Sequence, residues 1–168
     1  MKKRVLYLLC MAFAMMAWLP PQLWAQTRPS GGEGSSESPF LITTAEELKW
    51  YANYVNGESG DNVVHTTACA QLVKDIDLST VCGEGKGNWT PIAKYDVYKN
   101  GGKKFDGVFD GNGHTISNLY INNTRSSYLG LFGYITNRIK YICICQKFED
   151  GQCSNSWRPK YCRRVWFR

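Results

Sequence analysis

The spacing of apolar residues predicts one short helix near the start of the folded region. Leu48 is followed by apolar residues three, four and seven positions on, the spacing of a single helix face. Thr44 and Glu47 ahead of it match a capping box, in which the hydroxyl accepts the Glu47 amide and the carboxylate returns to the Thr44 amide. Gly57 ends the pattern. We therefore predict a helix over about residues 45–56.

Beyond this helix the apolar period changes from that of a helix to that of strands. Leu72, Ile76 and Leu78 share one parity, which predicts a single half-buried strand. Further short alternating runs follow, separated by corners rich in Gly and Asn such as residues 110–113 and 117–118. Sandwiches and barrels also contain short strands joined by such corners. Closely spaced corners without long hairpin strands favour a parallel β-helix.

The first 25 residues have the layout of a cleavable secretory signal peptide. Residues 2–4 are basic, residues 5–19 carry no charge, and two prolines precede the small residue Ala25. The apolar run is shorter than the roughly twenty residues that cross a membrane, so we expect export and no transmembrane segment in the mature chain. Residues 26–38 are rich in Gly, Ser, Pro and Glu, which predicts a flexible linker.

Charge is distributed unevenly along the chain. The formal net charge is +6 and the pI about 8.9. Residues 26–136 nevertheless carry nine Lys and Arg against twelve Asp and Glu, whereas residues 137–168 carry eight against two. The basicity therefore belongs to the two ends of the chain. A nucleic-acid partner is not expected on this charge pattern, and export argues against one as well.

The cysteines leave two alternatives open in the central region and predict no metal site in the tail. Export would permit a disulfide between Cys69 and Cys82, while two reduced, buried thiols fit the sequence equally well. Four of the seven cysteines lie after residue 137, and their spacing fits a structural zinc site poorly. We therefore expect neither a metal nor another cofactor. The tail cysteines are Cys143, Cys145, Cys153 and Cys162.

Two segments resemble a known family of bacterial surface proteins. Residues 105–121, Phe-Asp-Gly-Val-Phe-Asp-Gly-Asn-Gly-His-Thr-Ile-Ser-Asn-Leu-Tyr-Ile, are similar to the segment that leads into the repeats of GLUG-motif proteins. The name motif of that family, Gly-Leu-x-Gly, is matched by Gly130, Leu131 and Gly133. The family comprises bacterial adhesins and surface proteases that cleave immunoglobulin A, and the resemblance covers about residues 39–136.

The resemblance carries expectations for fold and function. It implies a mainly β fold over 39–136, the start of a right-handed parallel β-helix with the 45–56 helix near its N-terminal cap. It implies secretion or display on the outer surface of a Gram-negative bacterium. It further implies adhesion or binding to host or environmental glycans or surface proteins, and it transfers no catalytic residue to this chain.

The same resemblance makes the end of the chain unusual. A solenoid repeat needs about three stacked copies to be stable, yet only one Gly-Leu-x-Gly is present and the pattern ends after Thr136. We therefore expect residues 137–168, basic and rich in cysteine, to be disordered or translated out of frame. On this hypothesis the chain is a truncated piece of a longer repeat protein, or a product without a function of its own.

One cluster has the residue types of a catalytic or ion-binding site. Asp106, Asp110 and His114 could serve a secreted polysaccharide-active enzyme, with the carboxylates paired or holding calcium. The sequence Asp-Gly-Asn-Gly at 110–113 is equally what a tight turn with positive φ requires, and we favour the turn. The sequence therefore predicts no catalysis.

Overall fold

The structure, a computed structural model, describes residues 27–96, 98, 102–122 and 128–136, together with the backbone of 139–140 and 143–145. The predicted signal peptide and most of the 137–168 tail lie outside the described residues. No helix within the described ranges is long and apolar enough to cross a membrane.

The predicted helix is confirmed as α2 (Ala45–Asn56). Glu47 N donates to Thr44 Oγ1 at 3.1 Å, and Thr44 N donates back to Glu47 Oε2 at 3.2 Å, so the capping box is complete. Gly57 closes the helix in the left-handed conformation with φ of 73°. Local sequence signals therefore set both ends of α2.

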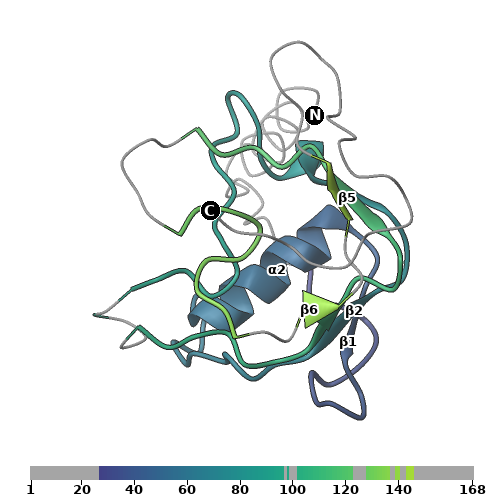
Figure 1. Cartoon of the computed structure of the whole chain (residues 1–168), viewed down its shortest axis with the longest axis vertical. Coiled ribbons are helices and arrows are strands. Elements are labelled where there is room, and N and C mark those ends of the chain that lie inside the picture. The colour runs from purple at the N-terminus through teal and green to yellow at the C-terminus, as the bar shows by residue number, and fades with distance from the viewer. Residues whose placement is uncertain are drawn as a thin grey trace, which may run out of the picture.

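The strands form two parallel sheets whose neighbours lie far apart in sequence. In the first sheet Phe40 pairs with Ala70, and Ala70 pairs with Phe109. In the second sheet Ile76 pairs with Ile116. Figure 1 shows α2 crossing the middle of the molecule beside β1 (Phe40–Ile42), β2 (Ala70–Leu72) and β6 (Ile139–Lys140). The first sheet has the strand order β1 (Phe40–Ile42), β2 (Ala70–Leu72), β4 (Phe109–Asp110) and β6 (Ile139–Lys140). The second sheet has the order β3 (Ile76–Asp77), β5 (Thr115–Ser117) and β7 (Cys143–Cys145). A short 3-10 helix, η1 (Leu78–Thr80), follows β3.

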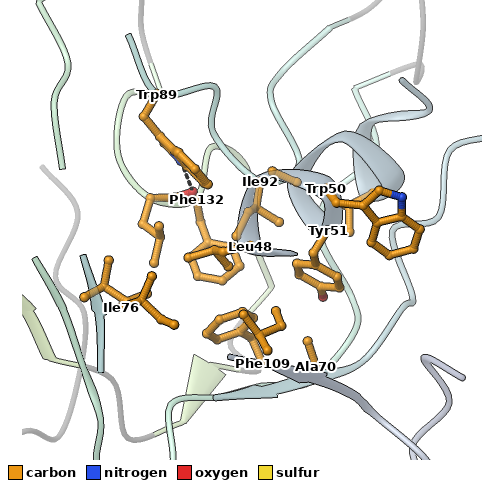
Figure 2. Close-up of a cluster of buried hydrophobic side chains, with 14 of the residues drawn as sticks. Leu48, Trp50, Tyr51, Ala70, Ile76, Trp89, Ile92, Phe109 and Phe132 are labelled. Carbon is orange, nitrogen blue, oxygen red and sulfur yellow. Dashed lines mark hydrogen bonds between the residues drawn. The ribbon is translucent and has the colours of Figure 1, made fainter. Parts of the chain in front are cut away.

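The expectation that residues 39–136 begin a right-handed β-helix capped by the 45–56 helix is wrong. The described residues instead form two small sheets of two- or three-residue strands, with α2 packed into the core that both sheets share. Leu48 and Tyr51 are fully buried, and Tyr51 points from α2 toward Phe109 and Ala70 (Figure 2). The helix therefore fills the interior, because its apolar face is wide enough to cover strands that are too short to enclose a core.

The single strand predicted from Leu72 to Leu78 is also wrong, because the chain bends between β2 and β3. Leu72, Ile76 and Leu78 are all buried as the parity required, but Val73 is 46% exposed and the two strands belong to different sheets. The Asp75 carboxylate accepts the backbone N–H of Thr115 at 2.9 Å and holds the bend against β5. Parity thus identified the buried side chains but not the bend.

The segment predicted as a flexible linker is 26–38, and its described residues, 27–38, lie as a loop along β1. Gly31 forms an antiparallel bridge with Leu41, and Cys69 N donates to Gly34 O at 2.8 Å. A Cβ on Gly32 would lie 1.9 Å from the carbonyl oxygen of Pro39. The small residues that suggested a linker therefore also permit a close approach to β1.

Candidate functional site

The Gly-Leu-x-Gly segment pairs in parallel with residues 92–93. Ile92 N donates to Leu131 O, and Gly133 N donates to Ile92 O, both at 2.9 Å. The indole Nε1 of buried Trp89 donates to the same Leu131 carbonyl at 3.1 Å, the dashed contact in Figure 2. Leu131 itself is 1% exposed. This segment therefore pairs with neighbouring backbone, and its Leu131 carbonyl accepts two hydrogen bonds from within the protein.

Gly133 has a packing reason to lack a side chain. A Cβ at this position would lie 2.7 Å from Ala93 O and 3.0 Å from the Cα of Lys94. Real Cβ atoms do not approach a backbone oxygen so closely, so a side chain would push the two segments apart. Gly130, the first residue of the motif, is half-buried. The structure thus places Leu131 and Gly133 in packing positions.

The structure gives Asp106 and Asp110 separate hydrogen-bond partners. Asp106 Oδ1 accepts from Thr136 Oγ1 at 3.2 Å. Asp110 Oδ1 accepts from Asn112 N at 2.8 Å inside the tight turn predicted there. That turn is present, because Asn112 has φ of 46° and the following glycine φ of 78°. The carboxylate of Asp110 therefore serves the turn.

His114 belongs to a contact within the second sheet, between the residues that directly precede β5 and β3. Its Nδ1 lies 3.3 Å from Asp75 Oδ1, the same oxygen that accepts the Thr115 amide. The Thr115 N–H, with a smaller contribution from His114, holds the pKa of Asp75 below its usual range. The side chain of Asp75 is 75% exposed, so this contact lies on the surface, where ion pairs contribute little to stability.

The two central cysteines, Cys69 and Cys82, are free and buried, so of the two alternatives the structure has reduced thiols and not a disulfide. Cys69 Sγ accepts the Val108 N–H at 3.3 Å, and Cys82 Sγ donates to Asn118 O at 3.7 Å. Burial raises the pKa of the Cys82 thiol, so it is protonated at neutral pH. Among the described residues no group of three or more His, Cys, Asp or Glu is placed to hold a metal ion.

Sequence reasoning missed a surface cluster of tyrosines. The ring centroids of Tyr95, Tyr128 and Tyr134 are 5.0 to 5.7 Å apart. Tyr95 is 47% exposed and Tyr128 is 49% exposed. Lys104 Nζ lies 4.9 Å above the Tyr134 ring. No local pattern in the sequence marks them out, because only the fold brings residues 95 and 128 together.

No family model matches the chain, and no solved structure shows significant similarity to it. Two curated proteins are similar to part of it. One is a Gly-rich membrane protein of Evansella cellulosilytica, 40% identical over 106 residues, which is 63% of this chain and 10% of that protein. The other is halomucin of Haloquadratum walsbyi, 33% identical over 102 residues, which is 61% of this chain and 1% of halomucin. The similarity therefore spans a small part of two much longer proteins.

Proposed function

We propose that this chain is a surface-displayed binding protein whose parent role is adhesion and which has no catalysis of its own. The observation that carries the proposal is the similarity to two long proteins whose names refer to the membrane and to a mucin. Those names support the coarser conclusion of a surface- or membrane-associated protein. The finer role in adhesion rests on the resemblance of residues 105–121 and 130–133 to the GLUG-motif family.

The described geometry supports a binding role over a catalytic one. Leu131 and Gly133 serve backbone pairing, and Asp110 serves a turn. The outer surface also carries an exposed aromatic cluster, the tyrosine cluster, with Lys104 in contact with it. The layout of residues 1–25 supports delivery of this surface to the cell exterior. The proposed partners are host or environmental glycans or surface proteins. The proposed location of the chain is the outer surface of a Gram-negative bacterium.

Protease treatment of intact cells tests the surface location. Cells that produce the chain are exposed to an added protease, and antibodies raised against the purified chain follow its loss. We expect the chain to disappear from intact cells while a periplasmic marker protein persists. A chain that becomes sensitive only after the envelope is broken would contradict the proposal.

Adhesion is tested separately from location. Beads coated with the purified chain are counted on glycan-coated and on bare surfaces, with beads carrying albumin as the control. We expect selective retention of the chain-coated beads on at least one glycan-coated or protein-coated surface. Equal retention of both kinds of bead on every surface would contradict an adhesive role.

A further inference from the structure

The tyrosine cluster, defined as Tyr95, Tyr128 and Tyr134, presents an aromatic surface to solvent. The rings of Tyr95 and Tyr128 are tilted by 33° with centroids 5.0 Å apart, so their exposed parts lie next to each other. Tyr134 meets Tyr95 edge-on at 90° and Tyr128 at 62°. Its edge contacts support the other two rings and limit their rotation. The three rings therefore pack as one unit and do not act as independent side chains.

The backbone of Tyr128 gives a second, independent sign that the cluster is used. Tyr128 has φ of 62°, in the left-handed region that costs an L-residue roughly 1–2 kcal/mol. Asn and Gly adopt this conformation more easily, whereas a bulky aromatic residue there is an outlier. Strained backbone of this kind persists where the surrounding structure holds it, and it is often found at ligand-binding sites.

The size of the surface favours a small ligand. A tyrosine side chain offers roughly 150–250 Å² of contact area, so two half-exposed rings leave about 200 Å². A stable protein interface buries about 800 Å² on each partner. The cluster is thus too small to anchor a globular partner by itself, but it matches the face of one sugar ring.

The chemistry of the surface selects the ligand class. A pyranose ring has an apolar face of C–H bonds and an edge of hydroxyls, and a tyrosine has an electron-rich face beside a phenol hydroxyl. Lys104, which contacts the cluster through the Tyr134 ring, adds a cationic donor at its margin. Tyrosine rings on loops also give contact area at low cost in conformational entropy.

We propose that Tyr95 and Tyr128, backed by Tyr134, form a platform on which the apolar face of a sugar ring in a carbohydrate chain stacks. Lys104 lies where it can donate to an oxygen of the same sugar. This inference rests on the proposed surface-binding function and names the class of ligand for it.

Affinity electrophoresis with two soluble polysaccharides tests the platform. The secreted full chain is run in native gels that contain either neutral galactomannan or acidic polygalacturonate. We expect retardation in at least one gel. Tyr95→Ala should weaken that binding by about tenfold or more, since a stacking ring contributes about this much in comparable aromatic platforms. Lys104→Gln should weaken binding to polygalacturonate more than to galactomannan.

Three further variants separate ring stacking from folding. Tyr95→Phe keeps the ring face and should keep binding. Tyr128→Gly removes the ring at a φ that glycine prefers, so it should lose binding while its thermal unfolding midpoint is unchanged or higher. Val73→Ala, at a similarly exposed apolar position outside the cluster, should leave binding unchanged.

The outcomes distinguish this inference from the proposed function. Absence of retardation in both gels, or retardation that survives Tyr95→Ala and Tyr128→Gly, overturns the carbohydrate platform. If the beads still adhere to a protein-coated surface in that case, the adhesive function stands and its partner is a protein. Glycan binding lost in the ring variants, with the chain still degraded on intact cells, supports both.

Discussion

At the scale of single residues, close backbone approach explains why several glycines occupy their positions. A Cβ on Gly107 would lie 2.0 Å from Ala68 O, and one on Gly133 would lie 2.7 Å from Ala93 O. Both glycines fall in the segments that resemble the GLUG family. In this chain both glycines are needed because two backbone segments lie in direct contact at each of them.

Gly133→Ala should destabilise the protein by about 1–3 kcal/mol, the usual cost of forcing extra atoms into a packed site. Urea unfolding followed by tryptophan fluorescence measures the change. Gly85→Ala is the control: its Cβ meets nothing within 4 Å, so it reports only the cost of its φ of 77°, about 1 kcal/mol. A Gly133→Ala protein as stable as the wild type would remove the packing explanation.

Two surface carboxylates make stability depend on pH. A hydrogen bond from His65 holds the pKa of Asp61 below its usual range, and the Thr115 amide does so for Asp75. Groups with a depressed pKa in the folded state stabilise above their unfolded pKa of about 3.9 and lose that contribution as pH falls through the lower folded pKa. The free energy of unfolding should therefore fall below about pH 4.

Asp75→Asn tests this pH dependence. The variant should be less stable than the wild type near pH 6, and the two should converge as the pH falls below the folded pKa of Asp75, where the wild-type carboxyl is protonated as well. Chemical denaturation at a series of pH values measures the difference. Parallel stability curves for the two proteins would show that Asp75 has no part in the acid response.

At the scale of elements, the start of α2 depends on one buried carboxylate. Glu47 is only 6% exposed. Its Oε2 accepts from Thr43 N at 2.6 Å, Thr43 Oγ1 at 2.7 Å and Thr44 N at 3.2 Å. The carboxylate therefore satisfies backbone donors that would otherwise be left without a partner at the helix N-terminus. Because α2 fills the core, this local feature supports the whole fold.

Thr44→Ala should lower the free energy of unfolding by about 1 kcal/mol, because the Glu47 amide loses its side-chain acceptor. The thermal midpoint, followed by circular dichroism at 222 nm, reports the loss. Thr90→Ala, an exposed threonine outside any helix, provides the matched control. Equal midpoints for the two variants would show that the cap does not limit stability.

At the scale of the whole molecule, one aromatic core joins α2 to both sheets. Phe109 of β4 contacts Tyr51 of α2 at 5.9 Å and Phe132 at 5.2 Å between ring centroids. Ile76 and Ile116 of the second sheet belong to the same buried cluster. The described residues therefore have a single core, and we expect them to unfold in one cooperative transition.

Phe109→Ala should cost about 3–5 kcal/mol, the usual range for deleting a buried aromatic ring. That is a large part of the roughly 5–15 kcal/mol that stabilises a domain. Tryptophan fluorescence and circular dichroism should show coincident urea transitions, shifted together in the variant. Val63→Ala, at an exposed position, should shift neither. Separate transitions for the two signals would contradict a single core.

The sequence allowed the helix to be predicted but not the sheets, for a physical reason. The signals that start α2 lie within four residues of one another, from Thr44 to Leu48, and the residue that ends it, Gly57, directly follows the helix. The strands pair across 30 to 40 residues, as Phe40 with Ala70 and Ile76 with Ile116. A period of two shows which side chains are buried, but it carries no information about the pairing partner or about a bend such as that before Ile76.

The candidate site shows the same division between local and distant information. The turn at Asp110 was predictable, because Asp-Gly-Asn-Gly determines its geometry within four residues. The role of Gly133 depends on Ala93, forty residues earlier, and the tyrosine cluster depends on Tyr95 meeting Tyr128. The Gly-Leu-x-Gly motif therefore identified the segment 130–133 in the sequence. The fold was needed to show that this segment packs against residues 92–94.

The double variant Asp106→Asn with Asp110→Asn separates a binding protein from a polysaccharide-active enzyme. Each asparagine keeps an oxygen acceptor for its present partner, Thr136 or Asn112, so the change in stability should be below about 1 kcal/mol. If binding is the function, adhesion of the coated beads is unchanged and neither protein releases reducing sugar from polysaccharide. Tyr95→Ala serves as the matched loss-of-binding control in the same assay. Sugar release by the wild type that vanishes in the double variant would establish the carboxylates as catalytic and refute the non-catalytic role, because an asparagine can neither donate the required proton nor act as the nucleophile.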